Sequence, residues 1–396
     1  LLGGEMTLSA VRIDGADASP FYGEGDGSIM IPLTSALEPG ASTVIRIDFH
    51  VCVPQDQELN YGVLASTDGV LAYAHGYPMI AVFDTDGWNL DVPPPYGDIT
   101  YADSSFYLVR VHAPADLIMC GSGTEASRKE AGGQQEVVLA TGPARDFYLA
   151  ASREYQVITR ASGDTTLRIC APDGTQKKAE RALDIAARAL DVFGQVYADY
   201  PYTKLDIVAT PTLALGIEYP GAFALNELLL TPDEDFGGTQ EDVWLESTTA
   251  HEAAHEWFYN LVGNDQLEDP WLDESLAQYA TLQYYADRYG KDGASGMRES
   301  FYRRWDRVQR EPIPIGKPVA EYYEDTYSAI VYGRGPLFFE ALQRQLGESG
   351  FNSFLQKYTA TFSWEEAMPE DLQRIAEAEC GCDLDDLFNE WVYGRP

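Results

Sequence analysis

The stretch of sequence that decides the fold reads His251-Glu-Ala-Ala-His255, followed eighteen residues later by Glu274 within Trp271-Leu-Asp-Glu-Ser275. Apolar residues recur at helical spacing around the first segment, and the second segment begins another such run. Positions i and i+4 lie on one face of a helix, so the two histidine side chains can point to one place. The pattern predicts two helices that bring two imidazoles and a carboxylate together.

The first of these helices is expected to run from Glu246 to Leu261. Gly263 stands just past its end, where glycine often closes a helix in the left-handed conformation. Nearly all of the chain after Glu241 shows helical periodicity. This part of the protein is therefore predicted to be mostly helical.

The two histidines and the glutamate form a ligand set for one Zn²⁺ ion per chain. A hydrolytic zinc site needs three protein ligands and one open position. His251, His255 and Glu274 supply three ligands at suitable spacing. A lone H-E-x-x-H segment can occur by chance on a helix, but this chain has only five histidines and a matching third ligand. We therefore predict a zinc-dependent hydrolase of peptide bonds.

Glu252 stands between the two histidines and is the candidate general base. Beside zinc, a carboxylate can take a proton from water and deliver it to a leaving amine. The oxyanion formed in this reaction needs a further stabilising group, and a tyrosine hydroxyl from the C-terminal part of the chain is suitable.

The first 172 residues show the pattern of strands. Apolar and polar residues alternate, in whole or in part, in Thr43–Val51, Phe106–His112 and Glu136–Ala140, and turn-forming residues separate these runs. Asp164–Cys170 is expected to be the last strand of this block. An antiparallel β domain of the sandwich type is predicted for this part of the chain.

The pattern changes at Ala171-Pro-Asp-Gly174. A helix is expected from Gln176 towards Tyr200, followed by strands at Leu205–Thr210 and Asn226–Thr231. We therefore expect an α+β protein of two domains, with residues 1–172 forming the β domain and residues 173–396 a mostly helical catalytic domain with a small sheet.

The composition excludes some classes of function. The 396 residues include 63 acidic and 27 basic side chains and carry a net charge of −36, which disfavours binding to nucleic acid. The same charge can also serve solubility alone. No run of apolar residues is long enough for a transmembrane helix.

The five cysteines leave their pairing open between free thiols and one or two disulfides. Cys380-Gly-Cys382 is expected to be too close for an easy mutual disulfide.

Two further motifs complete a family resemblance. Leu215-Gly-Ile-Glu-Tyr-Pro-Gly221 and Tyr332-Gly-Arg-Gly335 flank the H-E-x-x-H-x18-E pattern in chain order. Together these elements resemble the aminopeptidase N-like family of gluzincin metallopeptidases, which includes leukotriene hydrolase. The resemblance implies an N-terminal β saddle followed by a thermolysin-like catalytic domain, in a form without the C-terminal helical domain of many members.

The resemblance also implies roles for single residues. Glu218 would bind the free α-amino group of the substrate, and Gly216 and Ile217 would pair with the substrate backbone as a sheet edge. Tyr332 would stabilise the oxyanion, with Tyr327 as a second candidate near the substrate.

The chain departs from the family pattern at several positions. Ile217 and Tyr219 replace Met and Asn of the exopeptidase motif, so the wall of the substrate site is expected to differ. Asp273 and Ser275 replace Asn and Gly around the ligand Glu274, which changes the hydrogen bonds behind it. Without the helical domain, the cleft is expected to admit larger peptides.

The leading hypothesis is an aminopeptidase that acts on peptides with a free N-terminus. A zinc endopeptidase or other hydrolase on the same site is the alternative, and a non-catalytic binding module is a third. A β-saddle peptidase with strong negative charge and no initiator methionine is expected outside the cell or attached to its surface, rather than in the cytoplasm.

Overall fold

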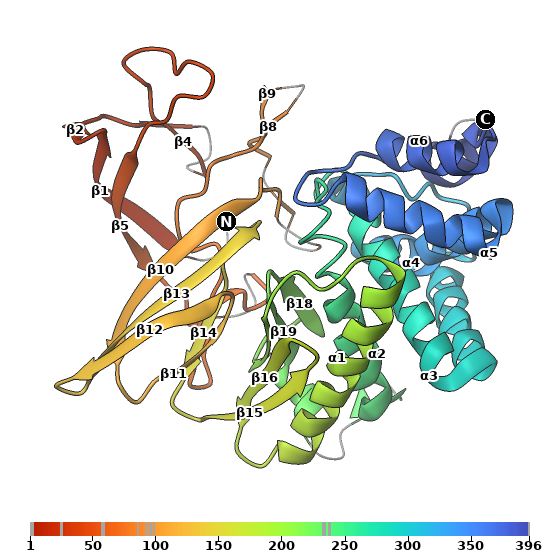
Figure 1. The fold of residues 1–396 in the computed structure, drawn as a ribbon, viewed down its shortest axis with the longest axis horizontal. Coiled ribbons are helices and arrows are strands. Elements are labelled where there is room, and N and C mark those ends of the chain that lie inside the picture. The colour runs from red at the N-terminus through yellow and green to blue at the C-terminus, as the bar shows by residue number, and fades with distance from the viewer. Residues whose placement is uncertain are drawn as a thin grey trace.

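The computed structural model describes residues 4–23, 27–56, 60–84, 87–91, 93–94, 97, 100–231, 235–236 and 239–394. Strands of the first 152 residues form one side of the molecule, and the helices of the C-terminal half form the other (Figure 1). A mixed sheet formed from residues 155–226 lies between them. The predicted α+β fold class is confirmed.

Where the structure describes the chain, the N-terminal strands form three antiparallel sheets and two short hairpins. The first sheet has the order β2-β1-β5, with β1 Glu5–Ile13, β2 Ala16–Asp17 and β5 Ile45–Cys52. The second has the order β10-β13-β12, with β10 Ser105–Pro114, β12 Thr124–Ala131 and β13 Gln134–Ala144. The third has the order β11-β14-β7-β6, with β6 Leu64–Thr67, β7 Val70–Tyr73, β11 Ile118–Gly121 and β14 Leu149–Ser152. The hairpins pair β3 Phe21–Tyr22 with β4 Ile29–Met30, and β8 Phe83–Asp84 with β9 Gly87–Trp88. These pairings confirm the strands predicted from alternation.

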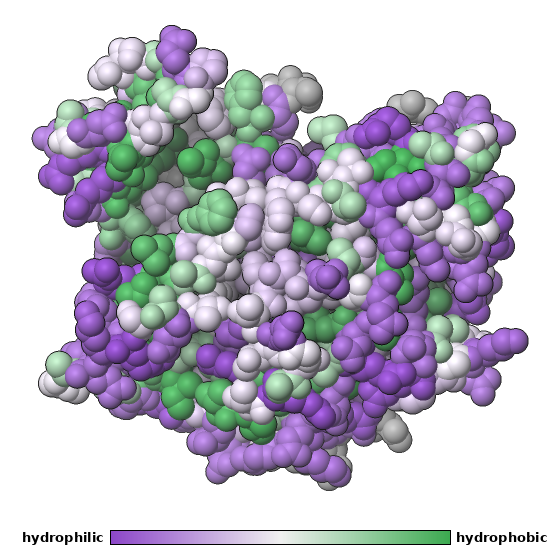
Figure 2. Space-filling model, viewed as in Figure 1, coloured by the Kyte–Doolittle hydropathy of each residue, from purple (hydrophilic) through white to green (hydrophobic). Residues whose placement is uncertain are grey.

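The face of the molecule seen in Figure 2 is largely hydrophilic, in keeping with the acidic composition. Hydrophobic residues are scattered over the N-terminal strands in the same view. Phe106 and Leu108 of β10 are among the exposed apolar side chains and line an open hollow between β10 and β13.

The central sheet carries strands from both sides of residue 172. Its order is β15-β16-β17-β19-β18, with β15 Tyr155–Ser162, β16 Thr165–Pro172, β17 Lys204–Thr210, β18 Gly216–Tyr219 and β19 Ala222–Asn226. Strands β16, β17 and β19 are parallel, and β18 runs antiparallel along the edge. The predicted domain boundary therefore falls between two elements that belong to this region, and the division into domains stays a prediction.

Helix α1 (Gln176–Val196) connects two parallel strands, β16 and β17, as such strands require a long crossover. The helix was predicted to continue towards Tyr200 and ends at Val196. The strand predicted at Asn226–Thr231 was misplaced. Strand β19 ends at Asn226, whose side chain accepts a hydrogen bond from the Leu228 amide and begins the 3₁₀ helix η2, Glu227–Leu230.

The two faces of the central sheet are covered by different parts of the chain. On β17, Leu205 and Ile207 belong to a core shared with helices α1 and α2, whereas Val208 belongs to a core shared with N-terminal strands. This alternation, with every residue of β17 buried, places the sheet in the interior. The edge strand β18 contributes Ile217 and Tyr219 to the core shared with the N-terminal strands.

Helix α2 (Glu241–Ala254) ends earlier than predicted. Beyond it, the amides of Asn260, Leu261 and Val262 bond to carbonyls five residues back, and Tyr259 adopts a φ of 127°. Gly263 is not a helix cap: its amide donates to the Glu365 carbonyl, and a Cβ at this position would lie 2.1 Å from the Arg145 guanidinium carbon. Tertiary contacts, rather than a local cap, determine this end of the helix.

The remaining helices follow in chain order. They are α3 Trp271–Trp305, η3 Asp306–Val308, η4 Val319–Glu321, α4 Glu324–Ala329, the π-helix η5 Ile330–Arg334, α5 Gly335–Thr361, α6 Pro369–Cys380, α7 Asp385–Phe388 and the π-helix η6 Asn389–Tyr393. A short hairpin of β20 Asp235–Phe236 and β21 Thr239–Gln240 precedes α2. In the described part of the chain, no helix is both long and apolar enough to cross a membrane.

Four of the cysteines are paired. Cys120 and Cys170 form a disulfide between β11 and β16, and Cys380 bonds to Cys382. The expectation that Cys380 and Cys382 are too close was wrong. Gly381 adopts a φ of 61° at the end of α6, and the two Cα atoms lie 5.1 Å apart, within the usual disulfide range. Cys52 is a free, exposed thiol.

Candidate metal and peptide site

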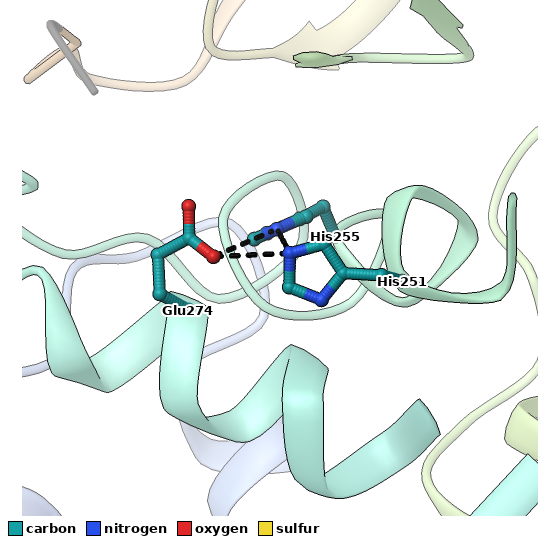
Figure 3. Close-up of side chains that lie close together, drawn as sticks. All are labelled: His251, His255 and Glu274. Atoms are coloured by element: carbon teal, nitrogen blue, oxygen red, sulfur yellow. Dashed lines mark hydrogen bonds and ion pairs between the residues drawn. The ribbon is translucent and has the colours of Figure 1, made fainter. Parts of the chain in front are cut away.

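The three predicted metal ligands converge in the structure (Figure 3). His251 Nε2 lies 3.0 Å from Glu274 Oε2 and 3.2 Å from His255 Nε2, and His255 Nε2 lies 3.7 Å from the same carboxylate oxygen. Helix α2 carries His251 and positions His255 immediately after its end, while Glu274 lies in the first turn of α3. The sequence prediction that these side chains meet agrees with this geometry.

The orientation of the ligands suits a divalent metal ion. His255 donates from Nδ1 to the Phe258 carbonyl at 2.9 Å, which leaves Nε2 directed at the other two ligands. All three side chains are buried, and their ligand atoms lie within 4.8 Å of one another. Two imidazoles and one carboxylate are a donor set that zinc favours.

The charge of the site also fits a cation. Glu218, Glu252 and Glu274 are all buried around the two histidines. Burial raises the pKa of the Glu252 and Glu218 carboxyls. Burial has the same tendency at Glu274, but hydrogen bonds with both histidines hold its pKa well below the usual range. Since carboxylates are costly to bury without a compensating positive charge, a divalent ion here would offset the excess negative charge.

Glu252 lies against the edge strand β18. A Cβ built on Gly216 would lie 2.4 Å from Glu252 Oε1, so any larger residue would displace the carboxylate or the strand. Glu252 Oε2 is buried and has no hydrogen-bond partner among the described residues. The carboxylate thus lies beside the ligands with an oxygen left to accept a proton.

Glu218 shares the site with Glu252 and His255. One ligand-type atom of each lies within 4.8 Å of those of the other two. The Glu218 carboxylate accepts a hydrogen bond of 2.9 Å from Gln266 Nε2. Gly216 and Ile217, the adjacent residues of the edge strand β18, are partly exposed, and among the described strands β18 pairs with β19 alone. The strand is therefore open to an extended peptide at the position of Glu218, as β-augmentation requires.

Tyr332 reaches the metal ligands from the π-helix η5. Its hydroxyl donates to Glu274 Oε1 at 2.5 Å, while Glu274 Oε2 faces the histidines. The ring centroids of Tyr332 and His251 are 5.9 Å apart. Short π-helical segments are frequent at functional sites. This one brings the Tyr332 hydroxyl into contact with Glu274, one of the candidate metal ligands.

Two other predicted residues pack against neighbouring tyrosines. Tyr327 packs edge-on against Tyr332, with ring centroids 5.8 Å apart. Tyr219 has 2% of its surface exposed and stacks on Tyr148 at 4.0 Å within the core shared with the N-terminal strands. Their predicted contacts with substrate stay predictions.

Several supporting residues were not identified from the sequence. Arg145 is buried and donates to the carbonyls of Ala102, Asn260 and Glu365, so the N-terminal part of the chain holds the segment that follows His255. Its partners are more than forty residues away in sequence, so a local pattern could not indicate its role.

Ser275, one of the departures from the family pattern, is accommodated by Gly335. Its hydroxyl donates to the Val331 carbonyl at 2.7 Å, and a Cβ on Gly335 would lie 1.9 Å from Ser275 Oγ. Ser275 thereby ties the start of α3 to the π-helix that carries Tyr332. Glu274 and Tyr332 are connected through the backbone as well as by their own hydrogen bond.

Comparison with known proteins places this fold and site in a family. The model of the Peptidase family M1 domain matches residues 181–391, which is more than half of the chain. The protein belongs to peptidase family M1, and the predicted family resemblance is confirmed.

Curated relatives are aminopeptidases. Aminopeptidase M1-B of Oryza sativa subsp. japonica is 29% identical over 241 residues, which is 58% of this chain and 27% of the relative. Aminopeptidase M1 of Arabidopsis thaliana is 26% identical over 302 residues, covering 72% of this chain and 34% of the relative. The chain thus spans about a third of the length of these relatives.

Solved structures share the fold. The M1 zinc metallopeptidase from Deinococcus radiodurans matches with a TM-score of 0.72 and 21% identity, covering 100% of this chain and 86% of that one. A mutant of that enzyme bound to a Tyr-Ser-Ala substrate matches with a TM-score of 0.73 and 22% identity, covering 100% and 85%. The arrangement of the β sheets and helices described above is therefore that of these metallopeptidases.

Proposed function

We propose that this chain is a zinc-dependent aminopeptidase that removes residues from the N-terminus of peptides. The observation that carries the proposal is the position of Glu218 beside Glu252 and His255 on the open edge strand β18. The M1 domain and the aminopeptidase relatives support the same activity.

His251, His255 and Glu274 would hold the zinc ion. Zinc supplies Lewis acidity at this point, since it polarises a carbonyl oxygen and makes water more acidic. The hydrogen bond from His255 to the Phe258 carbonyl and the one from Tyr332 to Glu274 orient two of the three ligands.

Glu252 is proposed to act as general base and then general acid. Its buried carboxylate accepts a proton from the attacking water and returns that proton to the amine nitrogen that leaves. The close approach of Gly216 keeps the carboxylate next to the backbone with which the substrate would pair. The attacking water, the Glu252 carboxylate and the scissile bond would thus lie close together.

Glu218 would bind the α-ammonium group of the substrate. A buried carboxylate forms a strong, charge-assisted hydrogen bond with an ammonium group, and its position determines how far the peptide can enter. Pairing of the substrate backbone with Gly216 and Ile217 would align the first peptide bond with Glu252. The hydroxyl of Tyr332 would leave Glu274 to donate a hydrogen bond to the carbonyl oxygen as that oxygen becomes negative.

The test uses purified protein with its metal content measured. We expect zinc at one ion per chain, hydrolysis of aminoacyl-4-nitroanilides, loss of activity with a chelator, and no hydrolysis of the N-acetylated substrates. Glu252→Gln is the matched inactive control because it keeps the shape of the side chain. Equal hydrolysis of blocked and free substrates, or cleavage within a blocked peptide, would instead favour the endopeptidase alternative.

We further propose that the protein works outside the cytoplasm. The support is the pair of disulfides, Cys120–Cys170 and Cys380–Cys382, since disulfides persist mainly in oxidising compartments. Thiol labelling of unfolded protein from its native source should modify Cys52 alone before reduction and five cysteines after it.

A further inference from the structure

Gln266 is a buried side chain whose amide joins three parts of the chain. With 1% of its surface exposed, it donates from Nε2 to Glu218 Oε1 at 2.9 Å and to Asp273 Oδ2 at 2.7 Å. Its Oε1 accepts a hydrogen bond of 3.1 Å from the Thr100 amide. The Gln266 amide thus forms hydrogen bonds with the edge strand β18, with helix α3 and with the N-terminal part of the protein.

The chemistry of a primary amide suits this position. Its nitrogen carries two hydrogens, so one group can donate to two carboxylates at the same time. Glu218 and Asp273 are both buried, and two carboxylates near one another repel strongly unless donors separate them. Among the described residues, Gln266 is the side chain that donates a hydrogen bond to Glu218.

Asp273 gives Gln266 a rigid anchor. Its second oxygen, Oδ1, accepts from Asn264 Nδ2 at 3.2 Å and from the Glu274 amide at 2.8 Å. Asp273 is therefore fixed in the first turn of α3, next to the candidate metal ligand. The anchored carboxylate in turn fixes the direction in which the Gln266 amide points.

The N-terminal part of the chain supports the same loop at two adjacent positions. Thr100 bonds to Gln266, and Asn89 Nδ2 donates to Asp265 Oδ2 at 3.0 Å. Asp265 Oδ1 accepts from the amide of Leu267, which keeps the loop closed. The position of Gln266, and through it that of Glu218, depends on segments far apart in the sequence.

We propose that Gln266 is a positioning residue that holds the Glu218 carboxylate in place to bind the α-ammonium group of a peptide substrate. The inference rests on the proposed aminopeptidase function. Gln266 occupies Oε1 of Glu218, so the other oxygen is left for the substrate, and the carboxylate cannot rotate without losing its donor. The amide itself does not touch the substrate.

The experiment measures discrimination between a substrate with an α-amine and one without it. Leucine-4-nitroanilide is compared with 4-methylpentanoyl-4-nitroanilide, and the ratio of their kcat/KM values is taken for each variant. This ratio does not change with the fraction of folded enzyme. We expect Gln266→Met to lower it about tenfold or more, mainly through KM for the amine substrate, because a hydrogen bond to a charged group is lost.

Gln266→Glu is the second variant. It keeps the length of the side chain and an oxygen for the Thr100 amide, but puts a third carboxylate between Glu218 and Asp273. We expect a larger fall in the same ratio. Calorimetry on metal-free protein gives a readout without catalysis: the preference for leucinamide over 4-methylpentanamide should fall in parallel.

Gln135→Met is the matched control. Gln135 is equally buried and donates from Nε2 to two acceptors, the carbonyls of Pro114 and Leu117 at 2.8 and 2.7 Å, within the N-terminal sheets. Its loss should lower stability and leave the substrate ratio unchanged.

Glu218→Gln separates this inference from the function on which it rests. If Glu218→Gln leaves the ratio unchanged, Glu218 does not bind the α-ammonium group and the proposed function fails. If Glu218→Gln abolishes discrimination while both Gln266 variants keep the wild-type ratio, the positioning role is overturned and the proposed function stands.

Discussion

Tyr332 and Glu274 share a hydrogen bond of 2.5 Å between the phenolic hydroxyl and Oε1, while Oε2 of the same carboxylate faces both histidines. One carboxylate therefore contacts the candidate metal position with one oxygen and the oxyanion-stabilising candidate with the other. A substrate carbonyl that takes the place of Glu274 as acceptor would find a hydroxyl already directed towards the metal.

This relationship leads to an expectation for Tyr332→Phe. The variant keeps the ring that packs near His251 but loses the donor, so we expect turnover to fall on the order of a hundredfold with little change in KM. Zinc content, measured by atomic absorption, should stay at the wild-type level. Tyr327→Phe is the control, because its ring packs edge-on against that of Tyr332; an equal loss in that variant would assign the oxyanion role to Tyr327 instead.

The contact between Gly216 and Glu252 gives a second expectation. A methyl group on residue 216 would lie 2.4 Å from Glu252 Oε1, so Gly216→Ala must displace the carboxylate or the edge strand. We expect kcat to fall at least about a hundredfold, the size of effect that misplaced reacting groups produce. Bound zinc should be unchanged.

Gly194→Ala is the control for that substitution. Gly194 lies within helix α1, and a Cβ there meets nothing within 4 Å. Alanine should be neutral for activity and raise the free energy of unfolding by about 0.5–1 kcal/mol, because glycine disfavours a helix interior. Equal activity in both variants would show that Glu252 does not need its present position.

Removal of the metal should destabilise the protein as well as inactivate it. The buried carboxylates of Glu218, Glu252 and Glu274 surround the site, and a bound cation is their natural counter-charge. At a free zinc concentration a thousandfold above Kd, binding adds about 4 kcal/mol to the free energy of unfolding. We expect the Tm to fall with a chelator and to recover when zinc is returned, as followed by circular dichroism.

His251→Ala is the test of the site in that experiment. This variant should bind little zinc and its Tm should no longer respond to the chelator. A wild-type protein whose Tm is the same with and without chelator would show that no stabilising metal occupies this cluster.

The convergence of His251, His255 and Glu274 could be predicted from the sequence because their spacing follows from helix geometry. Two histidines four residues apart need only one turn of helix to converge, and Glu274 needs only to begin the next helix. The position of Glu218 on an edge strand was likewise expected from its motif, and the structure agrees.

The end of α2 could not be predicted in the same way. Trp257, Phe258 and Leu261 continue the apolar pattern, but they are buried in a loop that bonds to itself and to the Glu365 carbonyl. Periodicity reports burial, and burial here does not require a helix. The positive φ of Tyr259 could not be predicted from the neighbouring sequence.

The support behind Glu218 was invisible for a related reason. Gln266, Thr100 and Asn89 are ordinary polar residues in loops, and more than 160 residues separate each N-terminal partner from its partner in the 265–266 loop. Whether these residues contact one another depends on how the N-terminal sheets pack against the central sheet. A pattern in a single sequence carries information on local structure, and these contacts are not local.

Arg334 provides the last expectation. It is buried, with 2% of its surface exposed, and donates to the carbonyls of Ile313, Glu390 and Trp391 at 2.7–3.1 Å. Its guanidinium also lies 4.6 Å from the centre of the Trp391 ring. The π-helix that carries Tyr332 is therefore held to the C-terminal π-helix η6 by one side chain.

We expect Arg334→Met to lower the free energy of unfolding by about 3 kcal/mol, because three backbone carbonyls lose the donor that this buried side chain supplies. Turnover of the folded enzyme should fall as well, since the π-helix and its tyrosine lose their anchor. Arg344→Met, on the exposed face of α5, should change the unfolding free energy by no more than about 0.5 kcal/mol. The test is urea unfolding and kcat, measured on the same samples. If the Arg334 variant is as stable and as active as the Arg344 variant, η5 keeps its shape through its own packing. Ser275 and Gly335 would then be sufficient to hold Tyr332 in place.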